Sequence, residues 1–200
     1  MQNKYFFIPF FIWSIFGAIL LLFFPASKLF FAVNSQHSEW GDFLNTSLSM
    51  YGRGDSIPII LISLLLIPAF RNRNYIITTL IFGILIPVII YLSKLFFESP
   101  RPLTVYGEGK VHTVQWLTNL YHLSFPSGHT IGAFGFFLLL SLYLPNKYKA
   151  WSLLLFFLAL GTAYSRLYLG QHFFADVYAG SIIGTLVTFI IYAFGKKYIS

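Results

Sequence analysis

The chain has 200 residues, of which 57% are hydrophobic and only 10% are charged. Soluble domains carry about 25% charged residues, so this composition excludes an ordinary soluble enzyme, and it also excludes a disordered chain. Cysteine is absent, which excludes disulfides, thiolate metal sites and cysteine nucleophiles. We interpret the formal net charge of +7 as basic residues sorted across a bilayer rather than as a nucleic-acid surface.

Apolar segments separated by short polar joints recur along the chain. A membrane-spanning helix needs about 20 apolar residues, and six segments approach that length. The second segment is short, so we expect its helix to begin near Met50. The pattern predicts an all-α integral membrane protein, a six-helix bundle that forms one domain over residues 1–200. The expected spans are Tyr5–Phe24, Ile57–Phe70, Tyr75–Phe97, Ser127–Leu144, Ala150–Tyr168 and Ala175–Phe194.

The basic residues predict the orientation of these spans. Threading six spans places seven basic residues on the side of the two termini and six on the opposite side, together with all acidic residues and all histidines. Three of those six are assigned to a binding site below. Because basic loops stay in the cytoplasm, both termini are predicted to be cytoplasmic. The seven are Lys4, Arg71, Arg73, Lys147, Lys149, Lys196 and Lys197.

The opposite side has two long connections, about Pro25–Met50 and Glu98–Pro126. The first mixes apolar and polar residues, so we expect an interfacial helix that lies along the membrane surface. Three histidines on this side match no motif and are expected to be solvated loop residues: His37, His112 and His122.

Two glycine-containing patterns are interpreted as structural. Arg53-Gly54-Asp55 resembles an adhesion tripeptide, but a tight turn before the second span explains it equally well. Gly180 and Gly184 have the spacing that allows membrane helices to pack closely, and we assign them no chemistry.

Three cations on the predicted outer side indicate an anion with several oxygens. Lys94, Arg101 and Arg166 fit phosphate, because guanidinium groups match the geometry of its oxygens. Ser127 and Gly128 stand where the fourth span should begin. Ser127 suits the N-cap position, and Gly128 would allow a phosphate to approach the free N–H groups of the helix start.

Two histidines and a carboxylate complete the candidate site. His172 and Asp176 are four residues apart, so on a helix they would share a face. A carboxylate bonded to one ring nitrogen leaves the other nitrogen to act and stabilises the cation that forms. We therefore predict His172 as a nucleophile that attacks phosphorus and His129 as the acid that protonates the leaving oxygen.

Taken together, these residues resemble a known signature. The segments Lys94-x6-Arg101-Pro102, Pro126-Ser127-Gly128-His129 and Ser165-Arg166-x5-His172-x3-Asp176 are similar to the three motifs of the type 2 phosphatidic acid phosphatase (PAP2) superfamily. The resemblance implies a six-helix fold, an outward-facing site and metal-independent dephosphorylation of a lipid phosphate. It implies phosphate binding by the three cations, with Ser127 and Gly128 as hydrogen-bond donors. It also implies that His172 is the nucleophile, His129 the acid and Asp176 the residue that orients His172.

The resulting prediction is a bacterial inner-membrane lipid phosphatase that needs no cofactor or metal and binds no nucleic acid. Its partners are the bilayer and a lipid phosphomonoester or diphosphate. The resemblance suggests phosphatidic acid, phosphatidylglycerophosphate, undecaprenyl diphosphate or lipid A phosphate. Two alternatives stay open. One is a phosphotransferase that uses the same residues, and the other is a membrane transporter or lipid-binding scaffold without catalysis.

Overall fold

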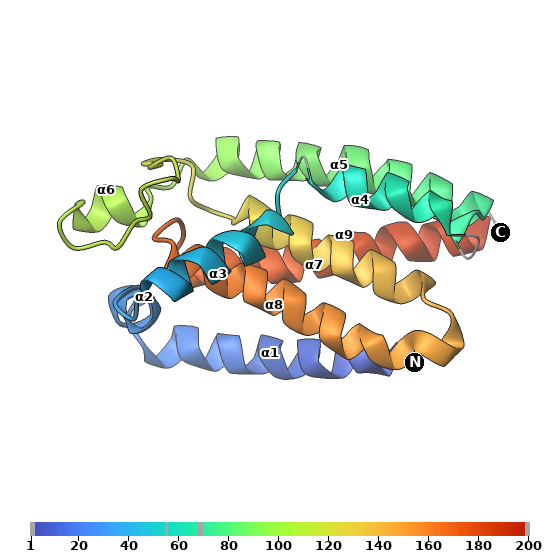
Figure 1. Ribbon diagram of the computed structural model, residues 1–200, viewed down its shortest axis with the longest axis horizontal. Coiled ribbons are helices and arrows are strands. Elements are labelled where there is room, and N and C mark those ends of the chain that lie inside the picture. The colour runs from blue at the N-terminus through green and yellow to red at the C-terminus, as the bar shows by residue number, and fades with distance from the viewer. Residues whose placement is uncertain (1–2, 55, 68–69, 199–200) are drawn as a thin grey trace.

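The computed structural model describes residues 3–54, 56–67 and 70–198, which contain helices and no strand. The predicted all-α class is confirmed for these residues. The helices pack into an elongated bundle (Figure 1). In chain order they are α1 (Lys4–Phe23), α2 (Ala26–Asn34), α3 (Glu39–Met50), α4 (Ser56–Ser63), η1 (Leu64–Leu66), α5 (Arg73–Phe97), α6 (Pro102–Tyr106), α7 (Gly128–Tyr143), η3 (Asn146–Trp151), α8 (Ser152–Tyr168) and α9 (Phe174–Tyr198).

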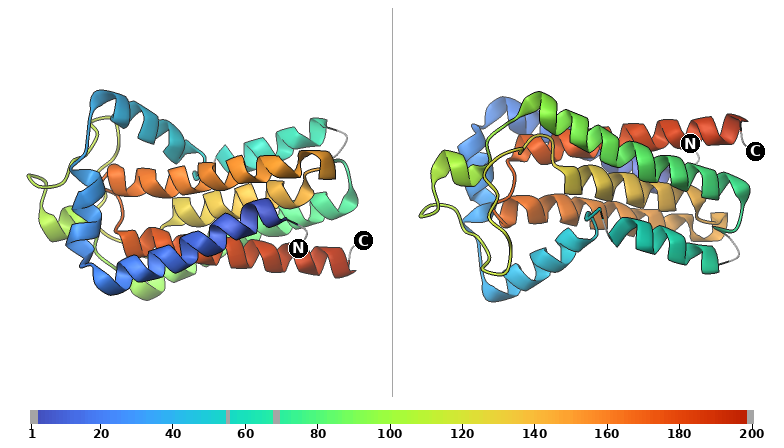
Figure 2. Two further views of the ribbon diagram at one scale, coloured as in Figure 1. Left: turned by 90° about the horizontal axis from the view of Figure 1, so that it is seen from below. Right: turned by 90° about the horizontal axis from the view of Figure 1, so that it is seen from above.

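Helix α7 forms the centre of the bundle. It packs most closely against α9 and α8, also touches α5, and is buried along nearly its whole length (Figure 2). The approach of α9 depends on small residues: a Cβ atom on Gly184 would lie 2.4 Å from the carbonyl oxygen of Ile131, and one on Gly180 would lie 2.9 Å from that of Ser127. The packing role predicted for both glycines is confirmed.

Four stretches of the described chain are long and apolar enough to cross a membrane, and two apolar helices are shorter. Their outer faces carry exposed apolar side chains, as a lipid-facing surface requires. The four stretches are Lys4–Phe23, Arg73–Tyr106, Asn146–Tyr168 and Phe174–Tyr198, and the shorter helices are Ser56–Leu66 and Gly128–Tyr143.

The second predicted span differs from the structure at its start. Helix α3 ends at Met50 and α4 begins at Ser56, so the span does not start near Met50. A turn intervenes, in which the N–H groups of Gly52 and Arg53 donate to the carbonyls of Ser49 and Met50 at 3.2 Å. Pro68 and Ala69 of this predicted span and Asp55 of the tripeptide lie outside the described residues.

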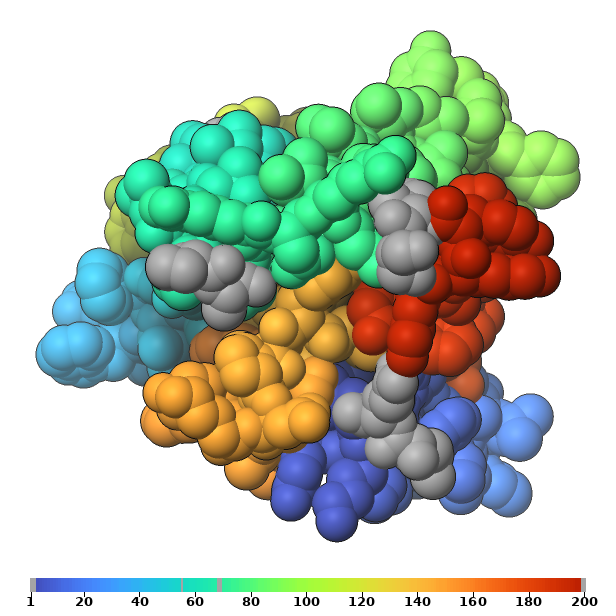
Figure 3. All heavy atoms as spheres, turned by 90° about the vertical axis from the view of Figure 1, so that its right-hand side faces the viewer, coloured from blue at the N-terminus to red at the C-terminus, as the bar shows by residue number. Residues whose placement is uncertain are grey.

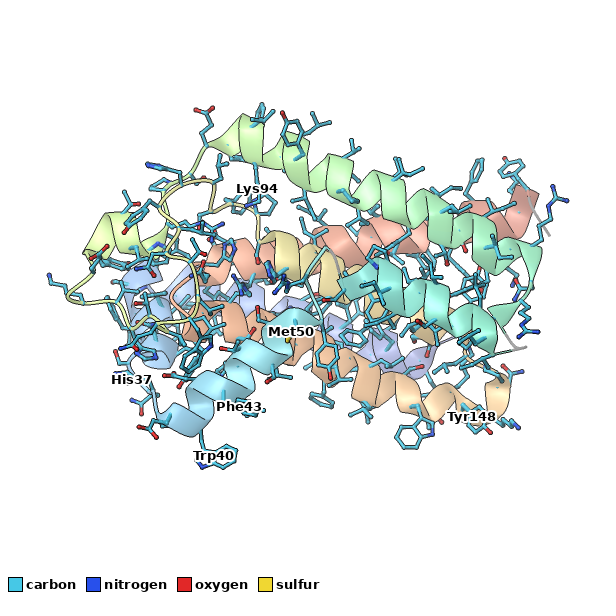
Figure 4. All side chains as sticks on the ribbon, turned by 45° about the horizontal axis from the view of Figure 1, so that its top comes forward. His37, Trp40, Phe43, Met50, Lys94 and Tyr148 are labelled. Carbon is cyan, nitrogen blue, oxygen red and sulfur yellow. The ribbon has the colours of Figure 1, made fainter. Side chains whose placement is uncertain are left out.

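The first long connection contains two helices, α2 and α3, where one interfacial helix was expected. Ser38 caps α3, its side chain accepting from the N–H of Gly41. Trp40 and Phe43 project away from the bundle, 81% and 63% exposed (Figure 4). We call the end of the bundle with α2 and α6 the loop end, and the opposite end, with both chain termini, the terminal end.

The prediction that His112 is a solvated loop residue is wrong. Its Nε2 lies 2.7 Å from Oδ1 of Asp42, and its ring stacks on that of His37 at 4.0 Å between centroids. The hydroxyl of Tyr168, at the end of α8, donates to the same carboxylate oxygen at 2.9 Å. The second long connection is therefore tied to α3 and α8, whereas His37 and His122 are exposed as expected.

The terminal end gathers most of the basic residues assigned to the cytoplasmic side. It is formed by the start of α1, the start of α5, η3 and the end of α9 (Figure 3). These elements carry Lys4, Arg73, Lys147, Lys149, Lys196 and Lys197.

Candidate active site

Side chains from three helices and two connections converge at the loop end. His129 lies in the first turn of α7 and Arg166 in the last turn of α8. Lys94 lies in the last turn of α5 (Figure 4), Arg101 immediately precedes α6, and His172 lies between α8 and α9. All five border one cavity of about 440 Å³. The structure therefore brings the three predicted motifs together.

His172 and Asp176 meet, although not in the way the sequence suggested. Gly170, with φ of +67°, follows the end of α8, and α9 begins at Phe174, so His172 lies before the helix and does not share a helix face with Asp176. Asp176 lies in the first turn of α9, where its Oδ2 accepts from the N–H of Phe173 at 2.9 Å. Nδ1 of His172 lies 3.3 Å from the same oxygen, which places the ring proton on Nδ1 and leaves the lone pair on Nε2.

Ser124 completes this arrangement and was missed in the sequence. Its hydroxyl donates to Oδ2 of Asp176 at 2.5 Å and lies 3.4 Å from Nδ1 of His172. All three residues are at most 4% exposed. Ser124 therefore holds the carboxylate that orients the imidazole. Its only sequence signal is its place two residues before Pro126, outside the motif.

Burial and neighbouring cations favour the neutral form of His172. Removal from water lowers the pKa of the imidazole well below its ordinary value, and the positive charges of Arg101, Arg166 and Lys94 lower it further. A neutral ring retains the Nε2 lone pair that a nucleophile needs. The same three cations that suit a phosphate thus favour the reactive form of the histidine.

Arg101 is held firmly beside this nitrogen. Its Nη1 lies 3.5 Å from Nε2 of His172 and donates to the carbonyl of Gln171 at 2.9 Å. Its Nε donates to the carbonyl of His122 at 2.8 Å. Lys94 donates to the carbonyl of Leu123. Both cations are fixed by backbone carbonyls that carry no full charge, so their positive charge stays available to an anion.

Arg166 is the most enclosed cation of the site. It is 5% exposed, and its Nη1 donates to the hydroxyl of Ser49 on α3. Its Nε has no hydrogen-bond partner among the described residues. An unpaired buried donor is costly, and a bound oxyanion would satisfy it.

The start of α7 offers fewer backbone donors than the sequence suggested. Ser127 is the N-cap, as predicted, and its hydroxyl oxygen accepts from the N–H of Thr130 at 3.4 Å. Its own N–H, however, donates to the carbonyl of Asp176 at 3.0 Å. Among the described residues, the N–H groups of Gly128 and His129 have no protein acceptor. Ser127 can therefore contribute only its hydroxyl proton, and the free amides belong to the next two residues.

The rest of the cavity wall is apolar. It runs from the cationic cluster along α4, α5 and α7, past residues such as Ile57, Phe82, Ile86, Pro87 and Ile90. A phosphate group with a long hydrocarbon chain matches this combination of a charged end and an apolar groove.

A family model described as the PAP2 superfamily matches residues 74–200. The chain belongs to the PAP2 superfamily. The match includes every predicted site residue and extends over α5 to α9, the elements that build the site.

Two PAP2 relatives are similar in sequence. Undecaprenyl-diphosphatase BcrC of Bacillus subtilis (strain 168) is 29% identical over 136 residues, which are 68% of this chain and 66% of that protein. Phosphatidylglycerophosphatase B of Haemophilus influenzae is 30% identical over 149 residues, with 52% of this chain and 59% of the relative covered. The chain thus spans less than two thirds of the length of both relatives.

Two solved structures share the fold. LpxE of Aquifex aeolicus superposes with a TM-score of 0.66 at 30% identity, over 86% of this chain and 94% of that one. A transmembrane PAP2-type phosphatidylglycerolphosphate phosphatase of Bacillus subtilis gives a TM-score of 0.71 at 21% identity, over 97% and 98%. The second likeness concerns the fold alone.

Within the described parts of the chain, no three histidine, aspartate or glutamate side chains group as metal ligands. The donors that face the cavity are mainly cationic, a set suited to holding an oxyanion directly.

Proposed function

We propose that this PAP2 protein is a membrane lipid phosphatase that hydrolyses a lipid phosphomonoester or diphosphate through a phosphohistidine, without a metal ion. The observation that carries the proposal is the juxtaposition of His172 with three cations in one cavity that continues into an apolar groove. The names of the sequence relatives, both lipid phosphatases, support the same class of reaction.

In the first step, the lone pair on Nε2 of His172 attacks phosphorus and the bond from phosphorus to the leaving oxygen breaks. Protonated His129 gives its proton to that oxygen, so the lipid leaves as a neutral hydroxyl or a protonated phosphate. The phosphoryl group stays on Nε2. The positive charge that develops on the ring is stabilised by Asp176, whose carboxylate faces Nδ1 at 3.3 Å.

In the second step, neutral His129 takes a proton from water, whose oxygen attacks phosphorus. The P–N bond breaks, inorganic phosphate is released and His172 returns to its starting form. Lys94, Arg101 and Arg166, with the amides of Gly128 and His129, stabilise the charge on the phosphoryl oxygens in both steps.

The direction of substrate entry follows from the cavity. The two shorter apolar helices, α4 with η1 and α7, are inferred to complete six spans together with the four longer stretches. The groove then lies within the membrane between α4 and α5, and a lipid chain enters it sideways from the bilayer. The terminal end lies in the cytoplasm, because the basic residues gather there. The site faces the exterior or periplasm.

The experiment is release of inorganic phosphate from a panel of lipid phosphates and diphosphates by the purified protein in excess EDTA. We expect activity on at least one lipid, full activity in EDTA, and loss to the uncatalysed background in His172→Ala. Acid-labile phosphate bound to the protein after rapid quenching would report the phosphohistidine.

Each alternative predicts a different result. A phosphotransferase would yield a phosphorylated acceptor in place of inorganic phosphate. Lipid turnover that survives in His172→Ala would contradict the catalytic role, and strict dependence on a divalent metal would contradict the mechanism.

A further inference from the structure

Gln171 is a buried polar residue that occupies none of the specified positions of the three motifs. It directly precedes His172 and is 3% exposed. Its side chain lies between Arg101 and the second long connection. A buried amide needs partners for its oxygen and for its N–H groups, so the partners of Gln171 indicate what this side chain contributes to the site.

The backbone of Gln171 is held by the same turn that holds the nucleophile. Gly170 has φ of +67°, and a Cβ atom on it would lie 2.7 Å from the carbonyl oxygen of His112, so glycine allows the chain to turn against the second connection. After this turn, the N–H groups of Gln171 and His172 both donate to the carbonyl of Arg166, at 3.0 and 3.1 Å. The turn that positions His172 therefore positions Gln171 as well.

The guanidinium of Arg101 meets Gln171 twice. Its Nη1 donates to the backbone carbonyl of Gln171 at 2.9 Å and to the side-chain Oε1 at 3.3 Å. The amide nitrogen of Gln171 faces the carbonyl of Thr118, 3.5 Å away. The reverse orientation of the amide would set N–H groups against the guanidinium, so the partners on both sides favour this one. The two shorter contacts of Nη1 thus both go to oxygens of Gln171.

The same guanidinium nitrogen lies beside the nucleophile. Nη1 of Arg101 is 3.5 Å from Nε2 of His172, the nitrogen that attacks phosphorus in the proposed reaction. A guanidinium Nη atom carries two hydrogens, and with both directed at Gln171 none is left for the lone pair on Nε2. Without the amide oxygen, one N–H group would be released to bind Nε2. Attack on phosphorus would then require that this hydrogen bond break first.

The amide also leaves the charge of the arginine in place. The acceptors of Arg101 among the described residues are the carbonyls of Gln171, His122 and Leu123 and the amide oxygen of Gln171, all of them neutral. A glutamate at position 171 would accept the same proton, but its carboxylate would lie next to a cation that suits an oxyanion and would repel that oxyanion. An amide satisfies the guanidinium without neutralising it.

We propose that Gln171 is a positioning residue of the phosphatase reaction and acts through Arg101. Its two oxygens accept both protons of Nη1, so that the lone pair on Nε2 of His172 stays free and the positive charge stays available to the phosphate. The inference rests on the proposed function and adds to it a residue outside the PAP2 motifs. It predicts that the attack on phosphorus and the binding of phosphate can be impaired separately.

The first test removes the amide and keeps the length of the side chain. In Gln171→Met, kcat for phosphate release from one lipid should fall about tenfold or more, while KM stays within about threefold of the wild-type value, because the released N–H group binds the nucleophile. Rapid quenching should show the same loss in the rate at which acid-labile phosphate appears on the protein. An unchanged kcat, or a loss that lies mainly in KM, would overturn the proposal.

The second test keeps the acceptor and adds a charge. Gln171→Glu should weaken the binding of inorganic phosphate, measured by isothermal titration calorimetry, by about tenfold or more, whereas Gln171→Met should stay within about threefold of the wild type. Gln115→Glu is the matched control, because Gln115 is exposed on the second connection and outside the cavity of the site. Equal losses in Gln171→Glu and Gln171→Met would indicate a merely structural role, and an equal loss in Gln115→Glu would indicate a general effect of charge. Either result would overturn the proposal.

The two tests separate this inference from the proposed function. If the wild-type protein released no phosphate from any lipid, the proposed function would fail, and the binding comparison would still decide on Gln171. If Gln171→Glu yielded no folded protein, kcat and KM of Gln171→Met would decide. An active wild-type protein with a fully active Gln171→Met variant would leave the proposed function intact and remove the inference.

Discussion

One ring nitrogen of His172 faces a carboxylate, and the other is available to a substrate. Nδ1 faces Asp176, and Ser124 binds the same carboxylate oxygen from the other side. This chain of contacts fixes the ring so that Nε2 is directed at the cavity beside Arg101. Among the described residues, Asp176 supplies the carboxylate beside His172, while Lys94, Arg101 and Arg166 border the cavity.

The depressed pKa of His172 leads to a prediction about pH. Protonation of Nε2 as pH falls removes the nucleophile, so the acid limb of kcat/KM due to this residue should lie below about pH 6.5, the usual value for histidine. Burial is the main cause of the depression, and Arg101 is the next. In Arg101→Gln, the pKa should rise and the acid limb should move to higher pH.

The measurement is the pH profile of kcat/KM for wild type and variant with one substrate, so that substrate ionisation is the same in both. Lys28→Gln serves as the control for loss of a distant positive charge. An acid limb that stays in place or moves to lower pH in Arg101→Gln would contradict the electrostatic explanation.

At the scale of elements, the contact between α7 and α9 positions two halves of the site. His129 and Ser127 start α7, and Asp176 lies in the first turn of α9. The two helix starts are joined by the hydrogen bond from the N–H of Ser127 to the carbonyl of Asp176. Close packing between α7 and α9 holds the two helix starts, and the site residues on them, in fixed relative positions.

Gly184→Ala should therefore destabilise the protein. The added methyl would lie 2.4 Å from the carbonyl oxygen of Ile131. Because that oxygen belongs to the backbone of α7, the clash can be relieved only if α7 and α9 move apart. Such overpacking costs about 1–3 kcal/mol. Thermal unfolding in detergent is the measurement.

Gly83→Ala is the matched control, because a Cβ atom at this helical position meets nothing within 4 Å. Alanine favours helix over glycine by about 0.5–1 kcal/mol, so this variant should be as stable as the wild type or more stable. Equal unfolding temperatures for the two variants would show that the α7–α9 approach is not tight.

At the scale of the whole molecule, the two ends of the bundle differ in character. The loop end carries the site and the tied connections, whereas the terminal end carries most of the basic residues of the predicted cytoplasmic side. The exposed apolar side chains between them form the surface that a bilayer would cover. This separation of charge along the bundle predicts one orientation in the membrane.

The orientation can be measured by labelling, since the natural chain has no cysteine. Lys110→Cys at the loop end should react with a membrane-impermeant maleimide in intact cells. Lys147→Cys at the terminal end should react only after the membrane is permeabilised. Both side chains are exposed, so accessibility within the protein is matched. The reverse pattern would place the site in the cytoplasm.

The class of protein, the approximate bounds of the long apolar helices α1, α5, α7, α8 and α9, and the motif residues could be predicted from the sequence. Long apolar segments with few charged residues predict membrane helices. Each motif lies within a short stretch of the chain, so its residues can be recognised without the fold. The four-residue spacing of His172 and Asp176 suggests a shared helix face, but α9 begins only at Phe174, so the two side chains meet across the start of the helix.

Which groups surround the motif residues depends on how distant segments of the chain pack. Ser124 and Gln171 reach the site through contacts between segments distant in the chain, and no local pattern distinguishes them from loop residues. The same holds for His112, whose partner Asp42 lies 70 residues away. A local pattern records which residue types are present, whereas the volume and charge of a cavity arise only when helices pack.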